Sequence, residues 1–343
     1  MTIAQINDAA NATCFRDDPG NTTAADESTA DSPIYLFLCT NAEYLQHAAA
    51  CLTSVFANNS GLFFDVTIVG RPTEMLDEEK LRRSLRRFPN YSLSFFKFTP
   101  PSDLVLPLNP NAHYTLDNWT RLWVEYFFSP AINRVLYLDC DIIVLGDLAP
   151  LWRTDLEGAL FGAVDIPGSS QGVTHLKMRA EDGYFNSGVL LIDLQQWRET
   201  RALDTVLRYI GQYPELMCYT LDQDALNACF CHRRKRLEYI WNVTWSFFQS
   251  RFEIPLGSAE IEQVRREARI LHFNSSPKPW SYFCEHPLRG EYQKYLNMTE
   301  WRGFVPPDRT IINRVRKSAS RILPERMKQA AKTILSLPSW ESR

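Results

Sequence analysis

The sequence lacks the features of membrane-spanning and secreted proteins. No run reaches the roughly 18 apolar residues of a spanning helix, and the N-terminus lacks the charged, apolar and small-residue order of a signal peptide. The eight cysteines show no repeated C-x-x-C spacing, which argues against a disulfide framework. Cys229, Cys231 and His232 form a C-x-C-H cluster, but the second pair that zinc would need is missing. We therefore expect a reduced, cytoplasmic protein.

Charge is nearly balanced over the whole chain but not along it. The 343 residues carry 37 Lys and Arg against 40 Asp and Glu, a net charge of −3 that gives no reason to expect nucleic acid as a partner. Residues 307–343 nevertheless hold nine basic residues against three acidic ones. Ile311, Val315 and Ile322 recur there at helical spacing, and Pro324 then interrupts. This pattern predicts a basic amphipathic helical tail that attaches to an anionic membrane, or an ordinary helix packed on the body.

Between these ends, strand-like and helix-like patterns alternate. Residues 1–33 are polar and aperiodic, which predicts a disordered leader. Residues 34–306 begin with the apolar run "IYLFLC", a helical segment, the strand-like "LFFDVTIVG", and a charged helix with Thr73 as its expected N-cap. Such alternation predicts a single α/β domain with a mixed, mostly parallel sheet.

One apolar run, "RVLYLDCDIIV", ends in two carboxylates. Asp139 and Asp141 stand at i and i+2, so both side chains point the same way if the strand stays extended. They lie near the carboxyl end of the strand, where open α/β sheets bind ligands. Oxygen ligands in this arrangement suit Mg²⁺ or Mn²⁺. The alternative is a pair of turn aspartates that close the strand.

Other polar residues stand at the ends of apolar segments. "LHFNSSPKPW" places His272 after a short strand and Lys278 six residues later; an imidazole ligand favours Mn²⁺ over Mg²⁺, and an ammonium suits phosphate. Asn186 precedes a buried strand, and Asp222 opens a helical segment. The alternatives are a buried, hydrogen-bonded histidine, a turn asparagine and an N-cap aspartate.

Four ordered stretches resemble one enzyme family. "RVLYLDCDIIV", "YFNSGVLLIDLQQWR", "DQDALN" and "HFNSSPKPW" look like the motifs of glycosyltransferase family 8, most closely its bacterial lipopolysaccharide and lipooligosaccharide glucosyl- and galactosyltransferases. The resemblance covers about residues 34–305. It implies a GT-A fold, a UDP-glucose or UDP-galactose donor, Mn²⁺, and transfer that retains the anomeric configuration.

The resemblance also implies roles for individual residues. Asp139, Asp141 and His272 match the metal ligands. The residues that match donor-binding positions are Lys278 at the diphosphate, Arg121 near the donor, and Asn186, Asp222, Gln223 and Asp165 around the transferred sugar.

The chain departs from the family pattern at two positions. Asn41, in "LCTNAEY", stands in the first-strand loop where the family has an acidic residue that contacts the base or ribose. Ser275 replaces the glycine of H-x-x-G-x-x-K-P-W, and a serine has less conformational freedom there. Both changes affect the uridine and diphosphate contacts and neither removes a metal ligand.

Taken with its basic tail, the resemblance implies a retaining hexosyltransferase that extends a lipopolysaccharide core or a related glycan at the inner face of the cytoplasmic membrane. One alternative is a family 8 enzyme that glycosylates a protein or itself. The other is a non-catalytic protein that binds nucleotide or glycan, against which the complete metal set argues.

Overall fold

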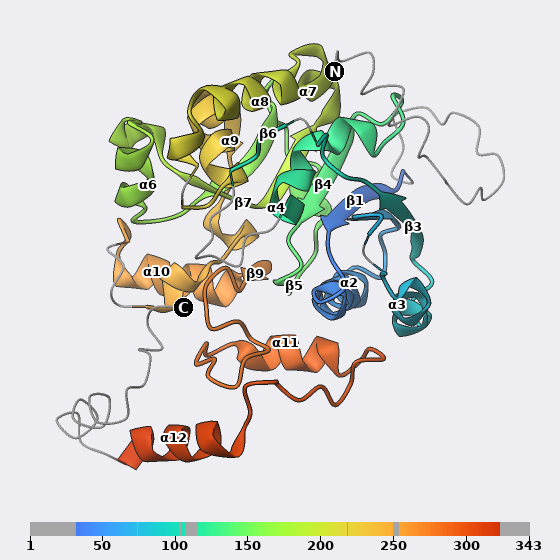
Figure 1. Ribbon diagram of the computed structural model, residues 1–343, viewed down its shortest axis with the longest axis vertical. Helices are drawn as coiled ribbons and strands as arrows, with labels where there is room; N and C mark the ends of the chain where they lie inside the picture. The colour runs from blue at the N-terminus through green and yellow to red at the C-terminus, as the bar shows by residue number, and fades with distance from the viewer. Residues whose placement is uncertain are drawn as a thin grey trace.

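The computed structural model describes residues 32–73, 75–102, 104–107, 116–217, 219–249 and 254–322 (Figure 1). Nearly all of the expected leader and the tail beyond Ile322 therefore lie outside the described residues. Among the described residues, no helix is long and apolar enough to cross a membrane.

A seven-stranded sheet forms the centre of the molecule (Figure 1), in the order β3-β2-β1-β4-β7-β6-β8. Only β7 runs antiparallel to its neighbours, so the expectation of a mixed, mostly parallel sheet is confirmed. The strands are β1 (Ile34–Cys39), β2 (Phe64–Gly70), β3 (Tyr91–Lys97), β4 (Arg134–Leu138), β6 (Phe161–Asp165), β7 (Phe185–Asp193) and β8 (Arg234–Arg236).

Apolar residues on the two faces of this sheet make two separate cores. In β1, Leu36 and Leu38 pack on one face with α2 (Leu45–Asn58) and α3 (Glu78–Leu85). Phe37, which lies between them, packs on the other face. The helices on that second face are α7 (Leu194–Glu199), α8 (Ala202–Gln212) and α9 (Asp222–Phe230). Both faces are thus covered, which leaves the strand ends for binding.

A small second sheet lies beside the first. Its strands, β5 (Ile142–Val144) and β9 (Ile270–His272), run antiparallel, with Ile142 opposite His272. Because β5 begins directly after Asp141, this pairing brings two distant motifs together. The remaining described helices include α4 (Leu116–Thr120), α6 (Ser170–His175), α10 (Ser258–Glu267), α11 (Arg289–Leu296) and α12 (Ile311–Ile322).

Two local expectations were wrong. The charged helix α3 begins at Glu78 rather than near Thr73, because the Asp77 carboxylate accepts a hydrogen bond from Lys80 N and caps the helix there. Asn186 lies within β7 rather than before it, since backbone pairing with β6 extends the strand to Phe185.

Candidate active site at the carboxyl edge of the sheet

The two aspartates lie in the link between β4 and β5. Asp139 N donates to Gly188 O at 2.9 Å, which continues the pairing of β4 with β7 by one residue. Asp139, Asp141 and His272 each offer a ligand atom, and these atoms lie within 4.8 Å of one another. His272 Nε2 is 3.1 Å from Asp141 Oδ1 and 3.7 Å from Asp139 Oδ2. The structure therefore brings together the three residues that the resemblance matches to metal ligands.

Backbone donors fix how the side chains around His272 are oriented. Gly188 N donates to Asn186 Oδ1 at 3.0 Å, so the Asn186 oxygen is an acceptor. Asn242 Nδ2 donates to the same oxygen at 2.8 Å, which turns Asn242 Oδ1 toward His272 Nδ1 at 3.0 Å. Nδ1 must then carry the hydrogen, and the lone pair of Nε2 faces the two carboxylates. A neutral imidazole in this tautomer is a metal ligand.

Space as well as chemistry suits a cation at this position. A Cβ at Gly188 would lie 2.3 Å from His272 Cε1 and 2.6 Å from Asp139 Oδ2, so any side chain there would fill the space between the ligands. Two carboxylates and an imidazole match Mn²⁺ better than Mg²⁺, which prefers oxygen alone. The residues present fit a divalent cation.

Lys278 lies against this cluster. Its Nζ is 2.5 Å from Asp141 Oδ2 and donates to Phe273 O at 2.9 Å. Burial by itself would raise the pKa of Asp141, but the charge of Lys278 and the hydrogen bond that Lys278 donates hold that pKa well below its usual value. Asp141 is therefore ionised, and Lys278 lies where phosphate oxygens would approach a bound cation.

Arg121 connects the metal cluster to the predicted sugar site. Its Nη2 is 3.1 Å from Asp139 Oδ1, and its Nε is 3.2 Å from Asp222 Oδ2. Burial opposes its charge, but these two carboxylates raise the pKa of Arg121 above its usual value. Tyr137 donates to the same Asp139 Oδ1 at 2.6 Å. Both partners of Asp139 thus engage Oδ1, while Oδ2 faces His272.

Asp222 is buried and does not cap its helix. Leu221 occupies the N-cap position of α9, and Asp222 instead pairs with Arg121 and accepts from Ser187 Oγ at 3.2 Å. The N-cap alternative is therefore wrong. Burial raises the pKa of Asp222 to about 7, although Arg121 lowers it in part. Leu221 has φ 52°, a conformation that is rare for residues other than glycine.

Gln223 lies beside Asn186 as the resemblance implied. Its Oε1 accepts from Asn186 Nδ2 at 2.9 Å and from Ser187 N at 3.0 Å. Asp165 does not join this group, because its carboxylate pairs with Arg234 and Arg236. In the β6–β7 register, Val164 is opposite Asn186, and the next residue, Asp165, points to the other face.

The two departures from the family pattern take different forms. Asn41 follows β1, where its side chain accepts from Tyr44 N at 3.0 Å and donates to Asp117 Oδ2 at 3.1 Å. Ser275 lies half-buried in the turn between His272 and Lys278 and does not adopt a positive φ. The turn therefore does not require the conformational freedom of glycine at that position.

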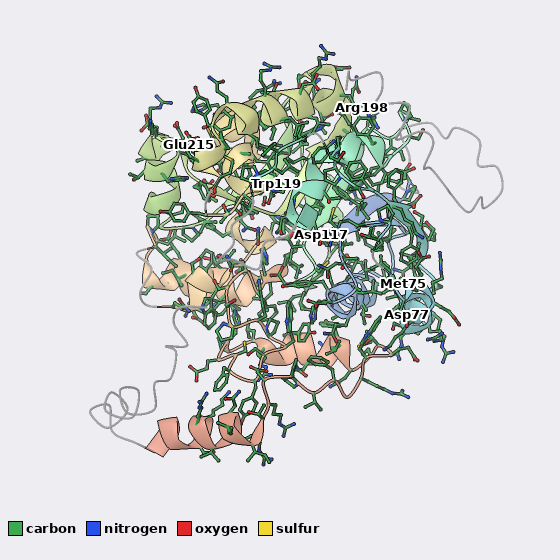
Figure 2. The ribbon with its side chains drawn as sticks, in the orientation of Figure 1. Met75, Asp77, Asp117, Trp119, Arg198 and Glu215 are labelled. Carbon is green, nitrogen blue, oxygen red and sulfur yellow. The ribbon has the colours of Figure 1, made fainter. Side chains whose placement is uncertain are left out.

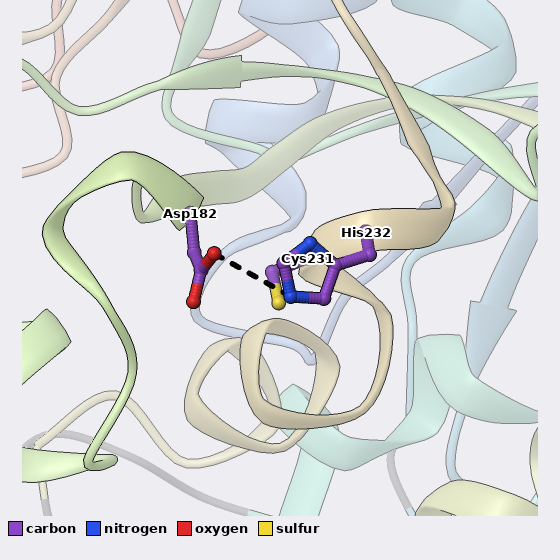
Figure 3. A group of neighbouring side chains, drawn as sticks. All are labelled: Asp182, Cys231 and His232. Carbon is purple, nitrogen blue, oxygen red and sulfur yellow. Dashed lines mark ion pairs between the residues drawn. The ribbon is translucent and has the colours of Figure 1, made fainter.

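Asp182, Cys231 and His232 form a second cluster of ligand-type side chains (Figure 3). His232 Nε2 is 3.4 Å from Asp182 Oδ1, a partner that the sequence did not suggest for the C-x-C-H segment. The Asp182 carboxylate already accepts from Arg179 N and Arg179 Nη2, at 2.8 and 3.1 Å. Burial also raises the pKa of the Cys231 thiol. Because a cysteine ligates a metal as the thiolate, a thiol that burial keeps protonated makes this cluster a poorer cation site than the first.

A family model described as glycosyl transferase family 8 matches residues 35–284. The chain belongs to glycosyltransferase family 8. The family assignment makes the protein a glycosyltransferase with a nucleotide-sugar donor and a glycan acceptor, and the predicted family is confirmed.

The chain is also similar to individual relatives and solved structures. The chain is 32% identical over 202 residues to general stress protein A of Bacillus subtilis (strain 168), covering 57% of this chain and 70% of the relative. It is 22% identical over 295 residues to the lipopolysaccharide 1,2-glucosyltransferase of Escherichia coli (strain K12), covering 82% and 83%. A crystal structure of the galactosyltransferase LgtC with donor and acceptor sugar analogues matches with a TM-score of 0.65 and 23% identity, over 80% of this chain and 98% of that one. This likeness confirms the predicted GT-A type fold.

Proposed function

We propose that this family 8 enzyme is a retaining, Mn²⁺-dependent hexosyltransferase that moves glucose or galactose from a UDP-sugar to a lipopolysaccharide core or a related glycan. The convergence of Asp139, Asp141 and His272 with Lys278 carries the proposal. A metal set next to a lysine suits a diphosphate leaving group. The match to a lipopolysaccharide 1,2-glucosyltransferase over 82% of this chain supports a lipopolysaccharide or related glycan as the acceptor.

Leaving-group stabilisation follows from the charges at this edge. When bound, a divalent cation held by Asp139, Asp141 and His272 would neutralise negative charge on the diphosphate. Lys278 lies at Asp141, so its ammonium can donate to phosphate oxygens at the same place. Arg121, buried and charged, supplies positive potential from beneath the site.

The surroundings of Gln223 and Asp222 favour attack from the face that the leaving group vacates. A covalent intermediate needs a carboxylate nucleophile near the anomeric carbon. Asp222 pairs with Arg121 and Ser187, and Gln223 Oε1 accepts two N–H groups. In front-face transfer the departing phosphate oxygen takes the acceptor proton, while Gln223 and Asn186 support the oxocarbenium-like sugar. A trapped glycosyl adduct on Asp222 or Gln223 would contradict this mechanism.

The start of the tail supports attachment to an anionic membrane. In α12, Ile311, Ile312 and Val315 are 79%, 65% and 63% exposed. Lys317, on the same helix, donates to Tyr282 O at 2.6 Å, which holds the helix to the body. Apolar side chains that point outward beside basic ones are the pattern of an interfacial helix. Figure 1 shows α12 beyond α11 and away from the sheet.

Transfer assays distinguish the acceptors. The protein is incubated with radiolabelled UDP-glucose or UDP-galactose, Mn²⁺ and truncated lipopolysaccharide, and label is followed into lipid and into protein. We expect label in lipopolysaccharide from one donor. Label in protein without lipid would support a protein acceptor instead, and Mn²⁺-dependent UDP binding without any transfer to lipid or protein would support a binding protein.

The tail is tested by co-sedimentation with vesicles. We expect binding to vesicles that contain phosphatidylglycerol and much weaker binding to phosphatidylcholine alone. Replacing Ile311, Ile312 and Val315 by serine should reduce binding to the anionic vesicles without changing UDP release in solution. Unchanged binding of this variant would contradict a role for the exposed face of α12.

A further inference from the structure

Three side chains from separate segments meet next to the metal cluster, at the carboxyl ends of β1 and β2. Asn41 follows β1, Arg71 follows β2, and Asp117 lies on α4. Arg71 Nε is 2.8 Å from Asp117 Oδ1, and Asn41 Nδ2 donates to Asp117 Oδ2 at 3.1 Å from 76 residues away. The Asp117 side chain is 13% exposed, so a ligand can still reach it.

The surrounding structure holds Asp117 in this place. Trp119, two residues along α4, is fully buried, and its Nε1 donates to Pro107 O at 3.1 Å. Figure 2 shows Asp117 and Trp119 near the middle of the molecule, whereas Met75 and Asp77 lie to the side at α3. Asn41 is itself fixed by Tyr44 N. The carboxylate is thus anchored at the sheet edge.

The order of the strands indicates the direction in which a bound nucleotide sugar would extend across the sheet. The metal cluster lies at the end of β4, with Asn186 on one flank in β7 and Asn41 on the other flank after β1. A nucleotide sugar that binds a cation through its diphosphate has its sugar on one side and its nucleoside on the other. With the sugar over β7, the nucleoside lies over β1 and β2, which are two and three strand spacings away, or about 10 to 14 Å across the sheet. A cavity of about 200 Å³ lies at the ends of β2 and β3, and Arg71 and Lys97 are among the residues that line it.

We propose that Asp117, held by Asn41 and Arg71, is the carboxylate that recognises the nucleoside of the donor by accepting a hydrogen bond from an N–H of the base or a hydroxyl of the ribose. The inference rests on the proposed UDP-sugar donor. The first-strand loop presents the neutral Asn41 at this point, and a distant helix supplies the negative charge. The acidic residue of that loop itself is Glu43, and it is exposed.

The test compares the wild type, Asp117→Asn and the matched loop variant Glu43→Gln by calorimetry in the presence of Mn²⁺. The ligands are UDP, 3-methyl-UDP without the base N–H, 2′,3′-dideoxy-UDP without the ribose hydroxyls, and pyrophosphate without a nucleoside. A hydrogen bond to a charged group corresponds to about a 10- to 100-fold change in Kd. We expect Asp117→Asn to weaken UDP binding by that factor and to leave pyrophosphate binding unchanged. The analogue that lacks the recognised N–H or hydroxyl should bind to Asp117→Asn and to the wild type with the same Kd. Glu43→Gln should bind UDP like the wild type.

Several results would overturn the inference. The first is that Asp117→Asn binds UDP as tightly as the wild type. The second is that Asp117→Asn loses as much affinity for pyrophosphate as for UDP, and the third is that it loses the same affinity for every analogue. The last is that only Glu43→Gln loses affinity for UDP. The first and last results assign recognition elsewhere, and the other two indicate a purely structural carboxylate. If the wild-type protein shows no Mn²⁺-dependent UDP binding, the donor assignment falls and this inference falls with it; if it binds UDP and Asp117→Asn binds equally well, only this inference falls.

Discussion

Replacing Asn242 is expected to weaken the metal site without touching a metal ligand. Asn242 is 1% exposed, and its amide joins His272 Nδ1 at 3.0 Å to Asn186 Oδ1 at 2.8 Å. Asn242→Ala removes the acceptor that fixes the His272 tautomer and leaves a buried N–H without a partner. An unsatisfied buried donor costs about 1–3 kcal/mol of folding free energy, and the loss of such an outer partner costs about 10- to 100-fold in metal affinity.

A second substitution separates the two contacts of Asn242. Asn242→Asp keeps an oxygen facing His272 but places a second oxygen against Asn186 Oδ1, where the donor was. We expect Mn²⁺ affinity close to the wild type in this variant, because the histidine keeps its acceptor, together with a lower kcat, because Asn186 is displaced from the sugar side.

The assay is Mn²⁺ titration of UDP release, with the Kd for Mn²⁺ checked by electron paramagnetic resonance. Asn297→Ala, at an exposed asparagine that ends α11, is the control and should match the wild type. If Asn242→Ala binds Mn²⁺ within twofold of the wild type while remaining folded, the argument that this amide sets the histidine tautomer is refuted.

Three further predictions follow from the same geometry. Gly188→Ala should lower Mn²⁺ affinity at least tenfold, since its Cβ would lie 2.3 Å from His272 Cε1, whereas Gly211→Ala, whose Cβ meets nothing within 4 Å, should bind Mn²⁺ normally. Asp222 has a higher pKa in the folded protein, about 7, than the roughly 4 of an unfolded chain, so the folded state takes up the proton first as the pH falls. The free energy of unfolding of the wild type, measured relative to Asp222→Asn by urea denaturation, should therefore fall as the pH rises from about 4 to 7 and level off above 7; a flat difference would show that the carboxyl is not perturbed. Ser275→Gly should leave UDP release unchanged and lower stability by no more than about 1 kcal/mol, because the serine has an ordinary φ; a marked gain in activity would show that the turn does need glycine.

The sequence pattern located Asp139 and Asp141 because its signal is local, whereas His272 entered the predicted metal set through the family resemblance. An apolar strand that ends in Asp139 and Asp141 identifies the carboxyl edge of a sheet, and strand alternation puts both carboxylates on one side. The short apolar run before His272 predicted that this residue ends another strand. In the structure, the pairing of β5 with β9 places His272 beside the aspartates. Mostly parallel strand order followed from the alternation of strands and helices.

Other parts of the site depend on contacts that no local pattern records. Asn242 is 30 residues from His272 and 56 from Asn186, and it stands in an irregular segment without periodicity. Asp117 is likewise 76 residues from Asn41. Asp165 differs from these two, because the family match suggested a role for it at the sugar site. Side chains alternate along β6, so Asp165 points away from Asn186 and pairs with arginines of β8.

UDP release decides whether this protein is a metal-dependent transferase. It is measured from UDP-glucose and from UDP-galactose, each with Mn²⁺ and with EDTA, for the wild-type protein and Asp141→Ala, with a truncated lipopolysaccharide acceptor present. Asp141 touches both His272 and Lys278, so its loss removes the residue that links the metal set to the diphosphate lysine. The proposed function predicts Mn²⁺-dependent release from one donor, abolished by EDTA and in the variant. Release that persists in EDTA or in Asp141→Ala would contradict a metal-dependent transferase built on these residues.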